Sequence, residues 1–299
     1  MKVAFIGLGN MGGGMAARQV ADGREVHAFD LSEAVVGKAV AAGARGAGSV
    51  SKAVQGVDAV ITMLPAGPHV RKVYSEEILP NAPRSALLID CSTVDVESAR
   101  AVAGQAKAGG FRFADAPVSG GTAAAEGGTL AFMVGCGETD FADVERALKP
   151  MARVVIRAGE HGAGQAAKIC NNMLLGISMI GTCEAFALAE RLGLSPDRFF
   201  EIASKSSGQC WSLTSYAPWP GVGPQTASDR NYEGGFAAGM MLKDLKLAQE
   251  AAAKAGATTP LGAQAAAIYA LFDRLGYGGK DFSGVLQMLR GELAGLNLE

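Results

Sequence analysis

The stretch VAFIGLGNMG, residues 3–12, decides the fold of the first half of this chain. Four apolar residues predict a buried strand, and the Ala-rich segment 11–22 predicts a helix directly after it. Between them the spacing GxGxxG predicts a turn at Gly7, a close approach to a pyrophosphate at Gly9 and tight helix packing at Gly12. A glycine-rich turn without a ligand is the alternative. We expect a dinucleotide to contact the loop residues Gly7, Leu8, Gly9, Asn10, Met11 and Gly12.

A carboxylate follows at the distance that a dinucleotide site requires. Asp30 ends the second predicted strand, 26–29, and lies 18 residues after Gly12. At this spacing a carboxylate binds a ribose 2′-hydroxyl. Leu31 and Ser32 come next, with no adjacent arginine to hold a 2′-phosphate. The sequence therefore favours NAD over NADP.

Apolar runs and helical segments alternate through the first half of the chain. This pattern predicts an α/β fold with a mostly parallel, doubly wound sheet, extended in mixed orientation after residue 111. Ligands of such sheets bind at the carboxyl ends of the strands. Leu64 and Pro65 would give an apolar contact there, and Thr93 would place a hydroxyl near the nicotinamide. Each of these is also compatible with a plain strand–loop junction. The predicted strands are 3–6, 26–29, 59–64, 87–89, 111–113, 130–134 and 154–156, and the helices between them include 11–22, 33–42 and 96–108.

The second half is predicted to be all-helical. Residues 163–192 contain no proline and read as one long apolar helix, so we place the domain boundary between 1–162 and 163–299. A membrane span is disfavoured because Lys168, Asn171, Asn172 and Glu184 would be costly in lipid. A helix buried on all sides, with Cys170 in the core, fits better. Further helices are predicted at 198–205, 240–255 and 260–275 and after Asp281, with a functional loop at 216–235.

Composition narrows the possible partners and cofactors. The 299 residues carry a net charge of −2, with 19% charged residues and 41 glycines, so neither nucleic acid nor an anionic membrane is an expected partner. Five cysteines without a CxxC pair predict free thiols and a cytoplasmic location. The three histidines are scattered, so no metal site is predicted. The length predicts two domains.

Two segments can supply chemistry to a bound dinucleotide. Residues 115–121, DAPVSGG, end a strand in small residues whose N–H groups suit a carboxylate, although an ordinary turn is equally possible. In the long helix, Lys168, Asn171 and Asn172 share one face. Desolvation favours a neutral lysine that can act as a base, and Gly164 would leave room for a substrate beside it. A purely structural polar network is the alternative.

Together these motifs resemble the β-hydroxyacid dehydrogenases over essentially the whole chain. The resemblance rests on GLGNMG at 7–12, DAPVSGG at 115–121, GQAAKICNN at 164–172 and KDL at 243–245. It implies an N-terminal Rossmann domain and a helical C-terminal domain. It also implies that Lys168 is catalytic and that Asn172 orients the substrate. The chain departs from the family pattern at Gly14, where proline is common, and at His69, where asparagine is frequent.

The resemblance further implies the remaining site residues and the reaction. The expected reaction is NAD-dependent oxidation of a short 3-hydroxy acid, 3-hydroxyisobutyrate to methylmalonate semialdehyde in valine breakdown, by a homodimer or homotetramer. Serine, tartronate semialdehyde, glyoxylate or succinic semialdehyde are alternative substrates, and a non-catalytic dinucleotide-binding module is a further alternative. The implied substrate-binding residues are Ser119, Gly120, Gly121, Asn171, Trp211 and Asp244. The implied cofactor-binding residues beyond the loop are Asp30, Leu64, Pro65, His69, Thr93, Phe236 and Lys243.

Overall fold

The computed structural model describes residues 1–293. The chain divides into two compact units, residues 1–168 and residue 169 onward. This division lies six residues after the predicted boundary, inside the long helix rather than at its beginning. The first turn of that helix is hydrogen-bonded to the sheet of the first unit, as shown below, and therefore belongs to it.

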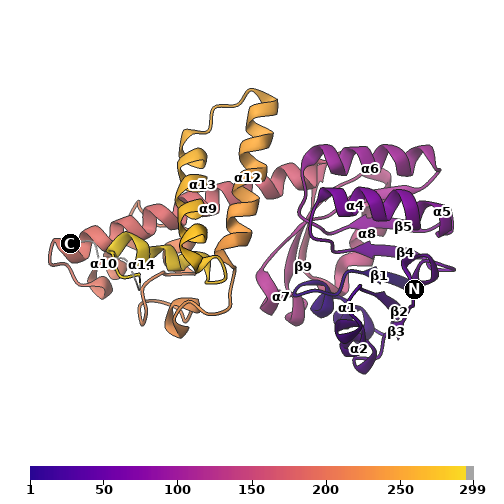
Figure 1. The fold of residues 1–299 in the computed structure, drawn as a ribbon, viewed down its shortest axis with the longest axis horizontal. Coiled ribbons are helices and arrows are strands. Elements are labelled where there is room, and N and C mark those ends of the chain that lie inside the picture. The colour runs from indigo at the N-terminus through magenta and orange to yellow at the C-terminus, as the bar shows by residue number, and fades with distance from the viewer. Residues whose placement is uncertain (294–299) are drawn as a thin grey trace. The chain divides into compact units, whose positions relative to one another are not determined.

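A nine-stranded sheet forms the centre of the first unit (Figure 1). Its main path runs β3-β2-β1-β4-β5-β6-β8-β7, and β9 pairs with β8. The strands from β3 to β6 are parallel, whereas β8 is antiparallel to β6 and β7. The predicted doubly wound sheet with a mixed extension is confirmed. The strands are β1 (Lys2–Ile6), β2 (Glu25–Phe29), β3 (Arg45–Gly46), β4 (Ala59–Thr62), β5 (Leu87–Asp90), β6 (Arg112–Asp115), β7 (Val118–Ser119), β8 (Leu130–Gly135) and β9 (Ala152–Gly159).

Helices cover both faces of this sheet, because most of its central strands are apolar on both sides. One core layer forms between the sheet and α1 (Gly12–Ala21), α2 (Glu33–Ala41), α7 (Gly121–Gly127) and α8 (Phe141–Leu148). The other forms against α3 (Val50–Ala53), α4 (Gly67–Val73), α5 (Leu79–Asn81) and α6 (Val96–Ala108). Phe5 packs in the first layer and Tyr74 in the second, and both are fully buried.

The second unit is helical in its described part, as predicted. Its core gathers fully buried side chains such as Met179, Phe186, Tyr269 and Phe272. The predicted helix ends were accurate to within about three residues, because Gly and Pro mark most of them. The helices are α9 (Ala163–Arg191), which begins in the first unit, α10 (Pro196–Ala203), α11 (Trp211–Thr214), α12 (Ala238–Ala255), α13 (Pro260–Phe272) and α14 (Val285–Arg290).

The loop between α11 and α12 is fixed by hydrogen bonds. Thr226 and Asp229 form a capping box around a short 3₁₀ helix, Ala227–Arg230. Asp281 is fully buried, and its Oδ2 accepts hydrogen bonds from the Tyr216 hydroxyl at 2.9 Å and from the Phe236 N–H at 2.7 Å. The two ends of the loop are therefore held at one carboxylate.

The long helix α9 is less buried than the sequence predicts. It is long and apolar enough to cross a membrane, yet 44% of its most apolar stretch is buried inside the protein, as in a core helix. The predicted burial on all sides is wrong, because Leu174 and Leu188 are 63% and 60% exposed. Cys170 is exposed as well, so its predicted place in the core is also wrong. All five cysteines are free thiols, as predicted.

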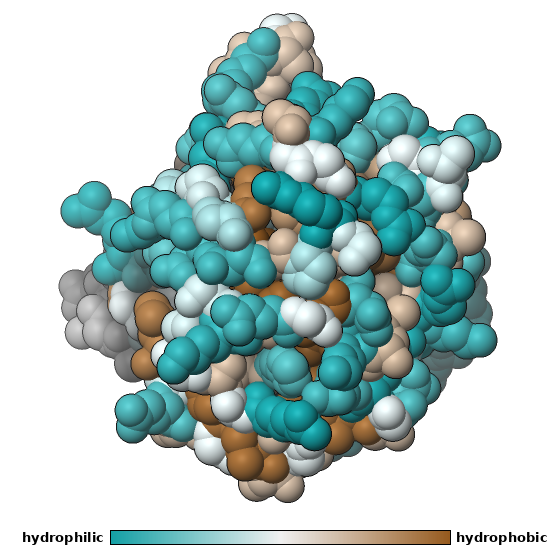
Figure 2. All heavy atoms as spheres, turned by 90° about the vertical axis from the view of Figure 1, so that its right-hand side faces the viewer, coloured by the Kyte–Doolittle hydropathy of each residue, from teal (hydrophilic) through white to brown (hydrophobic). Residues whose placement is uncertain are grey.

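Polar side chains cover most of the face shown in Figure 2, with apolar residues visible only in patches. This face lies on the side of the first unit where the chain begins (Figure 1). The low charged fraction of the sequence, 19%, is therefore enough to give this side a mainly hydrophilic surface.

Two buried carboxylates end neighbouring strands at the carboxyl edge of the sheet. Asp90 ends β5 and stands in register with Asp115, which ends β6. Both are fully buried. Oδ1 of Asp90 accepts hydrogen bonds from the hydroxyls of Thr62 at 2.7 Å and Ser92 at 2.6 Å. Burial is the largest influence on Asp90 and raises its pKa from 3.8 to about 6.

Replacing Asp90 with Asn should make the stability of the protein less dependent on pH. Between pH 4 and 6 the folded chain keeps a proton on Asp90 that the unfolded chain has released, so folding weakens as the pH rises. From pH 4.5 to 7.5 wild type should lose about 2 kcal/mol more of its free energy of unfolding than Asp90→Asn. Urea unfolding at both pH values measures this difference. Equal losses in the two proteins would contradict the raised pKa.

Candidate active site

The loop between β1 and α1 has the geometry of a dinucleotide cradle. Gly7 has φ +92°, and a Cβ there would lie 2.2 Å from the carbonyl oxygen of Met63. A Cβ on Gly12 would lie 2.0 Å from the carbonyl oxygen of Gly7. At Gly9, by contrast, a Cβ would meet nothing within 4 Å. Gly7 and Gly12 are thus required by the fold, whereas Gly9 faces open space, as expected where a pyrophosphate approaches the backbone.

Asp30 is held beside this loop. Its Oδ2 accepts a hydrogen bond from the Leu8 N–H at 2.7 Å, and its Oδ1 accepts one from the Ser32 N–H at 2.9 Å. A carboxylate has about four acceptor positions, so two stay available for the hydroxyls of a ribose. The loop and the carboxylate therefore fit a dinucleotide together.

The other predicted cofactor residues of the first unit lie at the same edge of the sheet. Leu64 and Pro65 follow β4, and Thr93 follows β5. The register of these strands aligns Ile6 with Thr62 and Thr62 with Asp90, so the loops after them are neighbours. His69 is exposed on the first turn of α4. Leu64 is tied to the next loop, because its N–H donates to the Ser92 hydroxyl at 2.8 Å.

The predicted carboxylate-binding segment also begins at this edge. It starts at Asp115, the last residue of β6, and Ser119 ends the short strand β7. Gly120 and Gly121 have φ +139° and +72°, a backbone path that residues other than glycine rarely adopt. Ser119 and Gly121 are half-buried, and Gly120 is exposed. The N–H groups of this turn are accessible, as anion binding requires.

Asp115 itself has a different role from the one predicted. Its carboxylate caps the start of α9: Oδ1 accepts from the Gly162 N–H at 2.6 Å and Oδ2 from the Gln165 N–H at 3.0 Å. Burial raises the pKa of Asp115, and these two hydrogen bonds oppose that effect. The sequence analysis missed both Asp115 and Gln165. The available signal was a lone acid in an apolar strand and a glutamine three residues before the candidate lysine.

Gly164 does not leave room for a substrate, so that prediction is wrong. A Cβ at this position would lie 2.4 Å from the carbonyl oxygen of Met133 and 2.8 Å from that of Asp115. The glycine is needed because the first turn of α9 packs directly on the backbone of the sheet. This packing also brings Lys168, one turn later, into a buried position with 7% of its surface exposed.

A polar cluster in the second unit surrounds Asn172, which is 1% exposed. Its Nδ2 donates to Oδ2 of Asp244 at 2.5 Å, and its Oδ1 accepts from Nδ2 of Asn171 at 3.0 Å. Lys243 Nζ lies 3.7 Å from Oδ1 of Asp244. Because an amide nitrogen carries two hydrogens, Asn172 can donate the second to a substrate oxygen. Lys168 and Asn172 stand four residues apart on α9 and so share a face of the helix.

Two predicted aromatic residues lie near each other in the second unit. Trp211 is 52% exposed and stacks on Tyr216 with a ring separation of 5.1 Å. Phe236 is half-buried, and its N–H is bound by Asp281, which also binds the Tyr216 hydroxyl. Asp281 therefore sets the positions of both aromatic groups.

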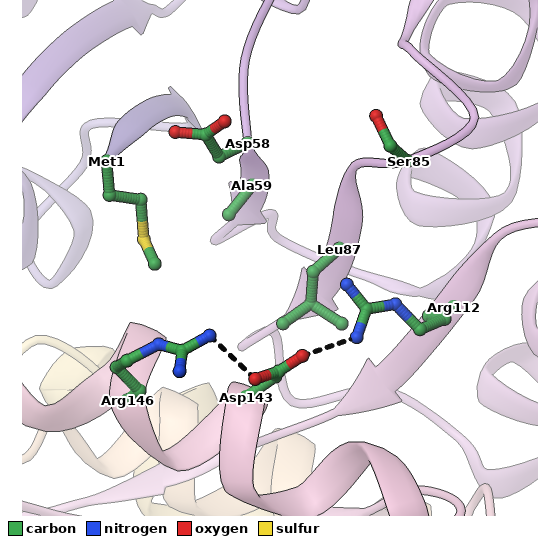
Figure 3. Close-up of a pocket in the computed structure, with 8 residues that line it drawn as sticks. All are labelled: Met1, Asp58, Ala59, Ser85, Leu87, Arg112, Asp143 and Arg146. Atoms are coloured by element: carbon green, nitrogen blue, oxygen red, sulfur yellow. Dashed lines mark hydrogen bonds and ion pairs between the residues drawn. The ribbon is translucent and has the colours of Figure 1, made fainter.

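A cavity of about 320 Å³ opens at the opposite edge of the sheet (Figure 3). It is lined at the beginnings of β4, β5 and β6, and its arginines Arg112 and Arg146 both pair with Asp143 at 2.6 Å. None of the predicted site residues lines it. Among residues 1–293 no group of three or more His, Cys, Asp or Glu side chains could hold a metal ion.

Comparison with known families covers nearly the whole chain. Residues 2–159 match the family described as the NAD binding domain of 6-phosphogluconate dehydrogenase. Residues 162–289 match the family described as NAD-binding of NADP-dependent 3-hydroxyisobutyrate dehydrogenase. The break between these two matches falls at the start of α9.

Individual relatives are similar over their full length. A 3-hydroxyisobutyrate dehydrogenase of Pseudomonas aeruginosa is 47% identical, covering 97% of this chain and 99% of the relative. An NAD-dependent L-serine dehydrogenase of the same species is 46% identical, covering 96% and 97%. The solved structure of the Mycobacterium tuberculosis 3-hydroxyisobutyrate dehydrogenase with L-serine has a TM-score of 0.93 at 44% identity, covering 97% and 99%.

These matches agree with the dinucleotide loop, the placed Asp30 and the two-unit fold. The predicted cofactor, NAD, and the predicted enzyme class are confirmed. The chain belongs to the β-hydroxyacid dehydrogenase family and is an NAD-dependent oxidoreductase.

Proposed function

We propose that this enzyme oxidises 3-hydroxyisobutyrate to methylmalonate semialdehyde, a step of valine breakdown. The observation that carries the proposal is the buried Lys168 one turn after the capped start of α9, in the unit that holds the dinucleotide loop. Relatives named for this reaction at 44–47% identity support it.

Lys168 accepts the hydroxyl proton in this proposal. The C–H bond at carbon 3 and the O–H bond both break, and a carbon–oxygen double bond forms. NAD, when bound, accepts the hydrogen of the C–H bond together with its two electrons. The proton of the O–H bond passes to the neutral amine of Lys168, which burial favours over the ammonium. The charges balance, because one hydride and one proton leave the alcohol.

Asn172 and the turn at Ser119–Gly121 orient the substrate. Asp244 holds the Asn172 amide at 2.5 Å, so its second N–H has a fixed direction toward the reacting oxygen. The accessible N–H groups after Ser119 would bind the carboxylate of the hydroxy acid. These two contacts would distinguish the carboxylate end of the substrate from the hydroxyl end.

The NAD preference follows from Asp30. Its carboxylate is fixed by Leu8 and Ser32, and its negative charge would repel the 2′-phosphate of NADP. Leu31, which follows, is 95% exposed and offers no positive charge to that phosphate.

Oxidation of L-serine is the second candidate. One relative is named for L-serine, and a related 3-hydroxyisobutyrate dehydrogenase was solved with L-serine. The two acids share a carboxylate and a primary alcohol but differ in a methyl and an ammonium group. A hydrophobic pocket discriminates one methyl by only about 1–3 kcal/mol.

A substrate panel tests the proposed reaction. NADH formation should give the highest kcat/KM with 3-hydroxyisobutyrate, at least about tenfold above L-serine, because a methyl group gains contact that an ammonium loses. Glycerate and 4-hydroxybutyrate serve as controls for the two other substrate classes. A higher kcat/KM with L-serine would replace the proposed substrate with the second candidate.

Replacing Lys168 with Met should abolish turnover and leave cofactor binding intact. Removing the proton acceptor should lower kcat by about 100- to 10,000-fold, because methionine fills the same volume without an amine. NADH titration by fluorescence should give an unchanged Kd. Lys107→Met, at an exposed site on α6, is the matched control and should keep full activity. Near wild-type kcat in Lys168→Met would refute the role of this residue.

The homo-oligomer and the cytoplasmic location stay predictions. The exposed leucines of α9 support the first, and the five free cysteines support the second.

A further inference from the structure

Gln165 is a polar side chain in the first turn of α9 that the proposed chemistry does not use. It is fully buried and lies three residues before Lys168, so the two side chains leave neighbouring positions of the helix. Burying a carboxamide is costly unless its hydrogen-bonding groups are paired. Its partners therefore show what this residue does.

The carboxamide of Gln165 binds the loop after β5 at two points. Nε2 donates to the carbonyl oxygen of Ser92 at 2.7 Å, and Oε1 accepts from the N–H of Val94 at 3.0 Å. Thr93 lies between these two backbone groups, so its position is fixed from both sides. One side chain thus connects the predicted nicotinamide-contacting residue to the helix turn of the predicted proton acceptor.

The same network continues on both sides of Gln165. The backbone N–H of Gln165 is bound by Asp115, which ends β6. The Ser92 hydroxyl donates to Asp90 at 2.6 Å and accepts from the N–H of Leu64 at 2.8 Å. All these residues belong to the first unit. The loops after β4 and β5 and the start of α9 are therefore joined by buried hydrogen bonds.

We infer that Gln165 is a positioning residue for hydride transfer, which holds Thr93 in a fixed relation to the helix turn that carries Lys168. The inference rests on the proposed function, in which Thr93 meets the cofactor and Lys168 accepts the proton. Gln165 itself touches neither the substrate nor the reacting atoms. Without its two bonds the loop and the turn can shift independently, and a displacement of about 1 Å costs up to about 100-fold in rate.

The test compares Gln165→Met with Gln19→Met. Gln19 is a matched control because it is also fully buried with two hydrogen-bonded ends. Its Nε2 donates to Ala147 at 3.0 Å and its Oε1 accepts from Arg24 at 2.8 Å, which ties α1 to α8 rather than to the cofactor edge. Both variants lose comparable buried hydrogen bonds, so both should unfold at a lower temperature than wild type.

Only the Gln165 variant should change the chemical step. For each protein we would measure kcat per NADH-binding molecule, KM, and the deuterium isotope effect with a 3-hydroxy acid labelled at the oxidised carbon. Gln165→Met should lower kcat by about 10- to 100-fold with KM within about threefold of wild type. Its isotope effect should be at least as large as that of wild type. Gln19→Met should keep both the kcat and the isotope effect of wild type.

A second variant covers the case in which Gln165→Met fails to fold. Gln165→Glu keeps the acceptor for Val94 but loses the donor to Ser92, so its kcat should also fall. Wild-type kcat per NADH-binding molecule in a folded Gln165 variant would overturn the inference and leave the proposed function intact. Full activity of Lys168→Met, or no turnover of any 3-hydroxy acid by wild type, would overturn both.

Discussion

The hydrogen bonds from Asp115 to the start of α9 are the constraint on which the site depends. The first N–H groups of a helix have no acceptor within the helix, and a buried helix end needs partners from elsewhere. Here a carboxylate at the end of β6 accepts from Gly162 at 2.6 Å and Gln165 at 3.0 Å. The beginning of α9 is therefore fixed to the sheet edge, and Lys168 follows at a set position along the helix.

This arrangement has an energetic cost that the network reduces. Asp90 and Asp115 are adjacent buried acids, and burial raises the pKa of each. Hydroxyl and N–H donors surround both carboxylates and favour their ionised forms. Removing one partner of such a network leaves a buried group unsatisfied, which costs about 1–3 kcal/mol. The donors of this network come from the loops that contact the cofactor edge, so the groups that hold the buried acids also hold the site.

The sequence predicted the parts with strong local signals. Gly7, Gly12 and Asp30 were placed correctly because their roles follow from one strand–loop–helix unit with a fixed spacing. Strands β3 and β7 were missed because two residues show no periodicity. Gly164 was misread because its close neighbours, Met133 and Asp115, lie far away in the sequence. The exposure of Leu174 could not be predicted either, because an apolar helix looks the same whether or not its own chain covers it.

Native-state hydrogen exchange of the backbone amides tests the central constraint most directly. First-turn amides normally exchange quickly because they lack helical acceptors. If Asp115 fixes the start of α9, the amides of Gly162 and Gln165 should be protected as strongly as those of Ala4 and Phe5 in the centre of the sheet. Fast exchange at Gly162 and Gln165, with protection beginning only after the first turn, would contradict this account.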